Sequence, residues 1–201
     1  MNYKNYKISI LTILIFICTS YTSEGQTNKG YVGISVGTAI PIGTFKNDGM
    51  AVRGLQLSLL NFGYRFTDNI GITVNWGGSA YTIDTDLNDI TSFGYLAIGP
   101  MFTIPAGTVV SIDIKPQYAI VYGKDEFIDG SEIEYSGGSG ILFGTSVNFD
   151  LGGPIGLSFN TDIFSISKFK EASVAGVDFG EVNFEDNINS FNITVGIQYR
   201  F

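Results

Sequence analysis

The sequence predicts an all-β protein, an eight-stranded antiparallel up-and-down transmembrane β-barrel. Only 15% of its 201 residues are charged and 44% are hydrophobic, whereas a soluble domain is about 25% charged. After the N-terminal segment, no apolar run approaches the ~20 residues that a membrane helix needs. From residue 31 onward, apolar residues alternate with small or polar ones, which is the period of a strand with two different faces.

The first segment, residues 1–25, is predicted to be a secretory signal peptide. Lys4 and one further lysine precede an apolar run that ends at Cys18, and this run is too short to span a bilayer. Small residues follow, and we expect cleavage after Gly25. Residues 26–201 then form one barrel domain. The single cysteine excludes a disulfide framework.

The first four predicted strands are 31–40, 53–66, 70–82 and 93–104. In the first, Val and Ile alternate with Gly, Ser and Ala. In the second, Leu alternates with polar residues until the phase slips at Leu59, which predicts a β-bulge. Ile, Val and Trp alternate with Gly, Thr and Asn in the third, and Leu, Ile and Phe alternate with Ala, Gly and Thr in the fourth.

The last four predicted strands are 109–122, 140–151, 155–167 and 190–201. The first of these shows the clearest alternation, with Val, Ile and Tyr on one face and Ser, Asp, Lys and Gln on the other. The other three alternate Phe, Leu, Ile and Val with Ser, Asn, Asp and Thr.

Two features resist this pattern. Pro100 and Pro116 lie inside predicted strands, where each removes a hydrogen-bond donor from the ladder, and we expect bulges to absorb them. Phe164 and Ile166 lie on the polar face of their strand, so we expect them near the outer rim of the barrel.

The connections alternate in length, as in outer-membrane barrels with short periplasmic turns and long outer loops. The short turns are predicted at 67–69, 105–108 and 152–154, and the long loops at 41–52, 83–92, 123–139 and 168–189.

The composition of the two strand faces indicates whether the outer surface of the barrel contacts lipid or water. The apolar side chains are too large and numerous to fit inside eight strands, so we expect them to face lipid. Aromatic residues near both strand ends, among them Tyr31, Trp76, Tyr81, Phe93 and Tyr95, predict girdles at the two interfaces. A soluble, secreted, lipocalin-like ligand-binding barrel with an apolar interior remains an alternative.

The polar face is expected to fill the lumen with a network of hydrogen bonds and ion pairs. Its predicted members are Arg65, Asp113, Lys115, Gln117, Asp150, Asp162 and Arg200. The chain has no histidine, so the His-dependent chemistry of known barrel enzymes is excluded, and we expect no enzyme activity and no cofactor. The net charge of −8 argues against nucleic-acid binding.

Acidic residues gather in the predicted long loops, which hold 14 of the 18 acids after residue 25. Asp84, Asp86 and Asp89 form a weak candidate calcium site without EF-hand spacing. Solvated loop charge is the simpler explanation. The acidic loops 123–139 and 168–189 are the expected contact sites for a protein partner.

The last strand carries the most distinctive motif. The chain ends in Ile-Gln-Tyr-Arg-Phe, with aromatic residues at Tyr199 and Phe201, and this ending resembles the recognition signal of outer-membrane barrels. The whole chain from residue 26 resembles the small OmpA/OmpX-like and PorT-like outer-membrane barrels. Shorter support comes from GTAIPIGTF at 37–45 and from Gly-Pro at 99–100.

The resemblance implies a monomeric protein of the Gram-negative outer membrane, in contact with lipid and lipopolysaccharide and inserted by the barrel-assembly machinery. Two roles are expected from it: a structural or interaction role through acidic extracellular loops, or membership of a secretion or transport assembly.

Overall fold

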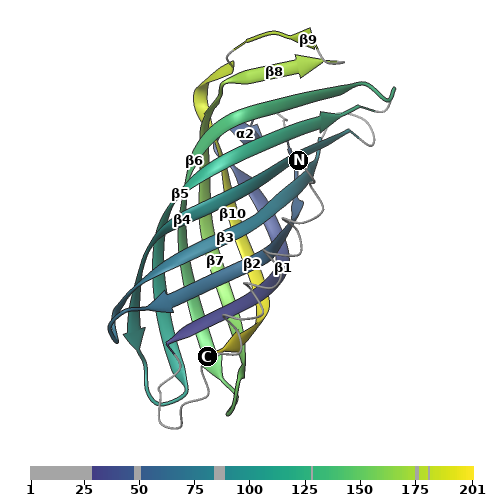
Figure 1. The fold of residues 1–201 in the computed structure, drawn as a ribbon. Coiled ribbons are helices and arrows are strands. Elements are labelled where there is room, and N and C mark those ends of the chain that lie inside the picture. The colour runs from purple at the N-terminus through teal and green to yellow at the C-terminus, as the bar shows by residue number, and fades with distance from the viewer. Residues whose placement is uncertain (1–28, 48–50, 84–88, 128, 175–176, 181) are drawn as a thin grey trace, which may run out of the picture.

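Eight long antiparallel strands form a closed barrel in the computed structural model (Figure 1). The structure describes residues 29–47, 51–83, 89–127, 129–174, 177–180 and 182–201. The predicted signal peptide and two of the candidate calcium ligands, Asp84 and Asp86, lie outside these residues.

The barrel strands are β1 (Gly30–Ile42), β2 (Gly54–Arg65), β3 (Ile70–Thr82), β4 (Ile90–Pro105), β5 (Val110–Glu126), β6 (Glu132–Asp150), β7 (Ile155–Phe169) and β10 (Val182–Arg200). Three short elements lie at the loop end: α2 (Thr44–Asn47), β8 (Glu171–Val174) and β9 (Val177–Asp178). Each of the first seven strands pairs with the next, β7 pairs with β10, and β10 pairs with β1. The predicted fold is confirmed.

The first and last strands close the barrel. Twelve residue pairs join β1 to β10, from Tyr31 opposite Arg200 to Ile42 opposite Asn189. Two backbone hydrogen bonds end this seam, from Gly30 N to Phe201 O at 2.8 Å and from Phe201 N to Gly30 O at 2.9 Å. Closure therefore leaves neither β1 nor β10 as an open sheet edge.

The three short turns lie where the sequence predicts them. In the turn 66–69, the Ile70 amide donates to Thr67 Oγ1 at 3.0 Å. In the turn 151–154, Gly152 and Gly153 have φ angles of 81° and 105°, which favour glycine. The Gly152 amide donates to Asp150 Oδ1 at 2.9 Å.

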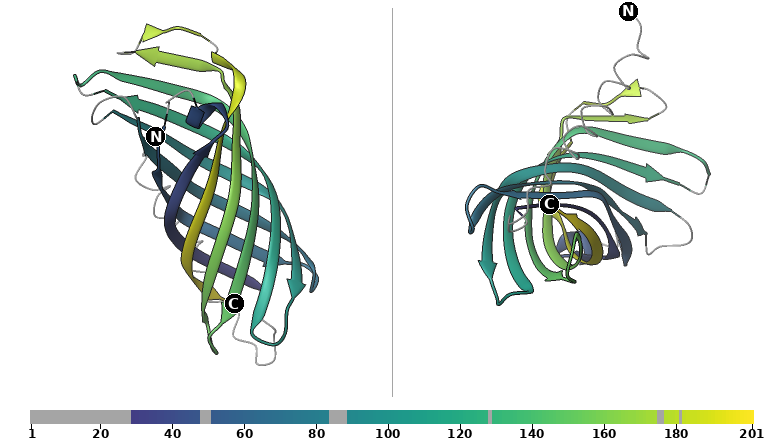
Figure 2. Two further views of the ribbon diagram at one scale, coloured as in Figure 1. Left: turned by 180° about the vertical axis from the view of Figure 1, so that it is seen from behind. Right: turned by 60° about the horizontal axis from the view of Figure 1, so that its bottom comes forward.

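The long loops are shorter than predicted, because β5 and β6 continue as a hairpin beyond the barrel. Most of the predicted loop 123–139 is strand, and the predicted loop 168–189 contains β8, β9 and the start of β10. Seen from behind and from below (Figure 2), the loop ends of β4, β5 and β6 splay away from the barrel, and β8 and β9 extend the sheet past β6.

The predicted bulge in β2 is present. The β2–β3 register shifts between Ser58 and Leu60. Gln56 and Ser58 face the lumen before the shift and Asn61 faces it afterwards, because the extra residue reverses the alternation. The bulge thereby keeps polar side chains inside and Leu side chains outside along the whole strand.

Large apolar side chains point outward from every barrel strand. They include Ile34 (61% exposed), Leu55, Trp76, Ile98, Tyr118, Ile141, Phe159 and Val195 (61% exposed). In a soluble lipocalin-like barrel these residues would be inside, so the structure excludes that arrangement. Among the described residues, no helix is long and apolar enough to cross a membrane.

The lumen has two zones. Near the short turns it is lined by polar side chains such as Asp113 and Asn148, and near the loops it is filled by apolar ones such as Leu142 and Phe164. Phe164 packs against Tyr95, with ring centroids 4.9 Å apart. Phe164 and Ile166 therefore belong to the apolar zone of the lumen near the loops.

The expected girdle is wrong for Tyr31, Tyr81, Phe93 and Tyr95, which are at most 8% exposed and face the lumen. On β4, the odd-numbered positions point inward. Position along the strand suggested a girdle, but the side of the strand places these rings inside. Trp76 and Tyr122 do point outward.

Candidate functional site

In the lower lumen, Asp113 is held by three neutral donors. Thr103 Oγ1 donates to Asp113 Oδ1 at 2.6 Å, and Asn148 Nδ2 and Tyr31 Oη donate to Asp113 Oδ2 at 2.7 and 3.2 Å. These four residues come from four different strands. The carboxylate therefore links β1, β4, β5 and β6 across the lumen.

Lys115 lies two residues after Asp113 on β5, on the same inward face and nearer the loops, and is 2% exposed. Asp162, on β7, and Asp113 are the carboxylates whose charges act on it. A Cβ placed on Gly144 would lie 2.5 Å from Asp162 Oδ1 and 3.5 Å from Lys115 Cε. Gly144 thus leaves room for both side chains, and Gln117 is buried above them.

The remaining predicted lumen residues lie at the short-turn end. Arg200 Nη1 forms an ion pair with Asp150 Oδ2 at 2.6 Å. Arg65 and Arg200 both line a very small cavity beside Asp113. The seven residues therefore occupy successive levels of the polar zone of the lumen. Asp150, the two arginines and Asp113 lie nearest the short turns, and Lys115, Asp162 and Gln117 follow toward the loops.

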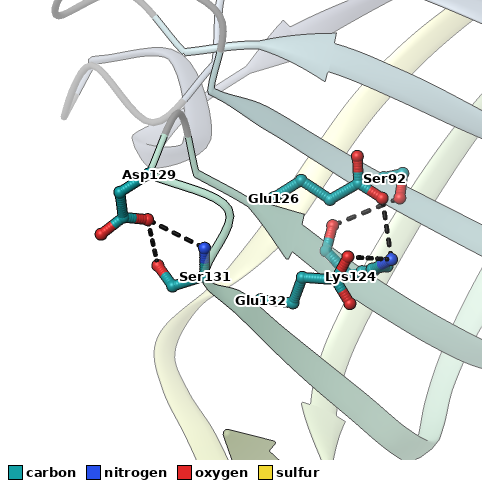
Figure 3. A network of polar contacts seen from close by, with 6 residues as sticks. All are labelled: Ser92, Lys124, Glu126, Asp129, Ser131 and Glu132. Atoms are coloured by element: carbon teal, nitrogen blue, oxygen red, sulfur yellow. Dashed lines mark hydrogen bonds and ion pairs between the residues drawn. The ribbon is translucent and has the colours of Figure 1, made fainter. Parts of the chain in front are cut away.

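Outside the barrel, the tip of the β5–β6 hairpin is organised by charge (Figure 3). Lys124 Nζ pairs with Glu126 Oε1 at 2.8 Å and with Glu132 Oε1 at 2.9 Å. Hydrogen bonds to these two carboxylates raise the pKa of Lys124. In the turn, Ser131 donates to Asp129 Oδ1 through its hydroxyl at 2.6 Å and through its amide at 2.9 Å, which lowers the pKa of Asp129.

Two further bulges turn aromatic rings toward the mouth of the barrel. The β5–β6 register shifts between Val121 and Gly123, beside Gly137 with its φ of 63°. The shift reverses the alternation and brings Tyr135 opposite Gly123. An extra residue in β7 opposite Ser139 does the same for Phe169, which is completely buried.

These rings help to line a cavity of about 300 Å³, which we call the mouth cavity. Its aromatic lining is Phe45 from α2, Phe93 from β4, Tyr135 from β6 and Phe169 from β7. Phe169 lies 6.2 Å from Phe93 and 5.2 Å from Tyr135 between ring centroids. Thr91, Asp125, Ile83 and Ile188 complete the described lining.

Asp125 is the only charged residue of the described lining. It follows Lys124 on β5 and points to the opposite face, because successive strand side chains alternate. Its Oδ2 accepts a hydrogen bond from Tyr135 Oη at 2.8 Å. Burial, followed by the charge of Asp125, raises the pKa of Tyr135.

The sequence did not indicate this cavity. Tyr135 and Phe169 fall in or beside segments predicted as loops, and their inward direction depends on bulges that no period-2 pattern marks. Asp89, the one candidate calcium ligand in the described part of the chain, belongs to no described cluster of three or more potential metal ligands.

Comparisons with known proteins agree with the fold. No protein-family model and no curated protein matches the chain. Among solved structures, Neisserial surface protein A is similar, with a TM-score of 0.62 and 13% identity over 86% of this chain and 97% of that one. Ail, the attachment invasion locus protein of Yersinia pestis, has a TM-score of 0.51 and 15% identity over 86% of this chain and 99% of that one. The chain therefore has the fold of the small eight-stranded outer-membrane β-barrels.

Proposed function

We propose that the protein is a non-enzymatic integral protein of the outer membrane that meets a protein partner through its β5–β6 hairpin. The observation that carries the membrane location is the outward belt of large apolar side chains on all eight strands. Water would be an unfavourable solvent for this belt, whereas lipid is a favourable one. The similarity of the fold to outer-membrane barrels supports the same location.

A non-enzymatic role is supported by how the lumen carboxylates are used. Asp113 accepts hydrogen bonds from three neutral donors, and Asp150 is paired with Arg200. Such groups stabilise a packed lumen. General acid or base catalysis instead needs a carboxyl group that reaches a substrate proton.

The partner contact is proposed for the hairpin tip and for the strands that extend it. The tip carries Glu126, Asp129, Glu132 and Glu134 in addition to the inward-facing Asp125, against the single basic residue Lys124. Beyond the barrel, Val177 and Phe179 are 60% and 69% exposed. Apolar side chains rimmed by charge are typical of protein interaction sites.

Membership of a secretion or transport assembly is the second candidate. The exposed Val177 and Phe179 favour it over a purely structural role, because a protein that only stiffens the membrane has no need of an apolar surface outside the barrel. Tyr199 and Phe201 face outward on and just after the closing strand. We propose that the barrel-insertion machinery reads them there, and that lipopolysaccharide surrounds the rim.

Two experiments test these proposals separately. For the membrane location, the protein is fractionated from cells and run on a gel with and without heating. A folded barrel should be found in the outer-membrane fraction and migrate faster unheated, and a protein found folded in the buffer-soluble fraction would refute the location.

For the partner, the wild type and a Val177→Ser/Phe179→Ser variant are extracted in detergent, and the masses of the intact complexes are compared by native mass spectrometry. We expect the wild type to copurify with a stoichiometric partner and the variant to lose it. A lone monomer in both samples would contradict the partner contact while leaving the membrane location intact.

A further inference from the structure

The mouth cavity combines an apolar lining with a single charged side chain among its described residues. Its lining is mostly aromatic and aliphatic, which suits an apolar body. It also contains one carboxylate, Asp125, and none of its described lining residues is a lysine or an arginine.

One oxygen of this carboxylate is unsatisfied. Asp125 Oδ2 accepts the hydrogen bond from Tyr135, but Oδ1 is buried and has no hydrogen-bond partner among the described residues. A buried carboxylate oxygen without a partner is costly, and the cost falls when a cation or donor approaches it.

The nearest lysine along the chain does not fill this role. Lys124 lies on the other face of β5 and is paired with Glu126 and Glu132 (Figure 3). The two acids and the lysine thus form a closed group outside the cavity. The charge of Asp125 is left to face the aromatic rings.

We propose that the mouth cavity binds a small organic cation, with an alkylammonium head group against Asp125 and its alkyl groups among Phe45, Phe93, Tyr135 and Phe169. Aromatic rings attract cations through their quadrupole, and clusters of such rings recognise quaternary ammonium groups. The acidic hairpin tip outside the cavity raises the local concentration of cations. This binding site goes beyond the proposed partner contact and does not depend on it.

The test compares two probes of the same shape. Choline and 3,3-dimethylbutan-1-ol differ in that a positively charged nitrogen replaces a carbon. Each is titrated into the full-length protein in a maltoside detergent, which has no choline head group of its own, and the side-chain resonances of Tyr135 and Phe169 are followed by NMR. We expect choline to bind about tenfold or more tightly than the neutral alcohol.

A matched pair of variants tests whether the charge of Asp125 itself attracts the cation. Asp125→Asn removes the charge inside the cavity but keeps the acceptor for Tyr135, and we expect it to weaken choline binding by about tenfold. Glu126→Gln removes one charge from the neighbouring position on the outer face, and we expect a change of less than about twofold. The heat-dependent gel shift checks that both variants fold.

Several results would overturn the proposal. Equal affinity for the two probes would make the site a purely apolar pocket, and the absence of choline binding would refute it outright. Equal weakening by both variants would assign the effect to the general negative charge of the hairpin. If Asp125→Asn does not fold, the comparison of the two probes on the native protein still decides.

Discussion

Pro100 and Pro116 face each other across the same interruption of the β4–β5 ladder. The pairing stops at Ile98 opposite Tyr118 and resumes in the same register at Phe102 opposite Ile114, so no bulge absorbs the prolines. The Ala106 amide donates to Val110 O at 2.9 Å and the Thr103 amide donates to Asn69 O at 2.8 Å. Even-numbered residues of β4 therefore hydrogen-bond toward β5, and odd-numbered ones toward β3.

Both missing amide donors consequently fall in one gap. Pro100 remains paired with Ile72 of β3, and Pro116 with Phe143 of β6. The two prolines do not interrupt the β3–β4 and β5–β6 ladders at their own positions, so the cost of both is confined to a single site.

Replacing both prolines should strengthen the barrel. Pro100→Val and Pro116→Val each supply one amide to the facing carbonyl, and we expect each to raise the free energy of unfolding by about 1 kcal/mol. Urea unfolding of the protein in lipid vesicles measures this. A double variant that is less stable than the wild type would show that the gap is needed for the curvature of the barrel rather than merely tolerated.

Removing the buried lysine should destabilise the lumen. Lys115→Met leaves Asp162 without its compensating charge, and we expect a loss of about 3–5 kcal/mol in unfolding free energy. In the double variant Lys115→Met/Asp162→Asn, most of this loss should be recovered. If Lys115→Met alone keeps the stability and heat resistance of the wild type, the lumen network does not contribute to stability.

A charge in the outward belt should be costly only where lipid surrounds it. Ile98 is 51% exposed, and we expect Ile98→Arg to lower the unfolding free energy by about 2–4 kcal/mol in a bilayer. Ser92→Arg, on the same face nearer the loops, should cost less than about 1 kcal/mol. The emission of Trp76, the only tryptophan, follows unfolding. Equal effects of the two substitutions would argue against a lipid-facing belt.

The hairpin tip should respond to acid. The hydrogen bonds from Ser131 favour the charged form of Asp129, so the pKa of this carboxyl lies below its ordinary value of 3.8. The stabilisation of the turn is present above that value and is lost as the pH falls through the lower folded pKa. The amide shift of Ser131 should titrate with a midpoint below 3.8, and Ser131→Ala should move the Asp129 carboxyl titration upward. A midpoint at or above 3.8 in the wild type would contradict this hydrogen bonding.

The sequence predicts the barrel well because alternation and turn composition are local signals. The eight strands, the three short turns and the bulge at Leu59 follow from them, and the side chain of Asp113 points where its place on the polar face requires. Alternation does not reveal a β-bulge where the sequence shows no regular period-2 pattern. The glycines and serines around Gly137 read as a loop, and Ser167 reads as the end of the predicted strand 155–167, yet both places hold bulges that turn Tyr135 and Phe169 inward.

The mouth cavity also depends on residues that are distant in the sequence. Phe45, Asp125 and Ile188 line the same cavity only because the barrel is closed. A local sequence pattern does not indicate that such distant residues lie close together. The aromatic residues of β4 are different, because Phe93 and Tyr95 share the odd-numbered face of Ala97. Alternation along the strand therefore indicates their inward direction, and the girdle expectation used only their position near the strand end.

The seam between β1 and β10 also constrains the order of folding events. A nascent polypeptide that ends before β10 has two open edges, one on β1 and one on β7. The twelve residues of β1 that pair with β10 then have no partner strand. Closure must wait for the last segment to be synthesised, and its contacts have the greatest sequence separation in the molecule, which slows folding. Until the final strand pairs with both neighbours, the edges of β1 and β7 remain open to pairing with other chains.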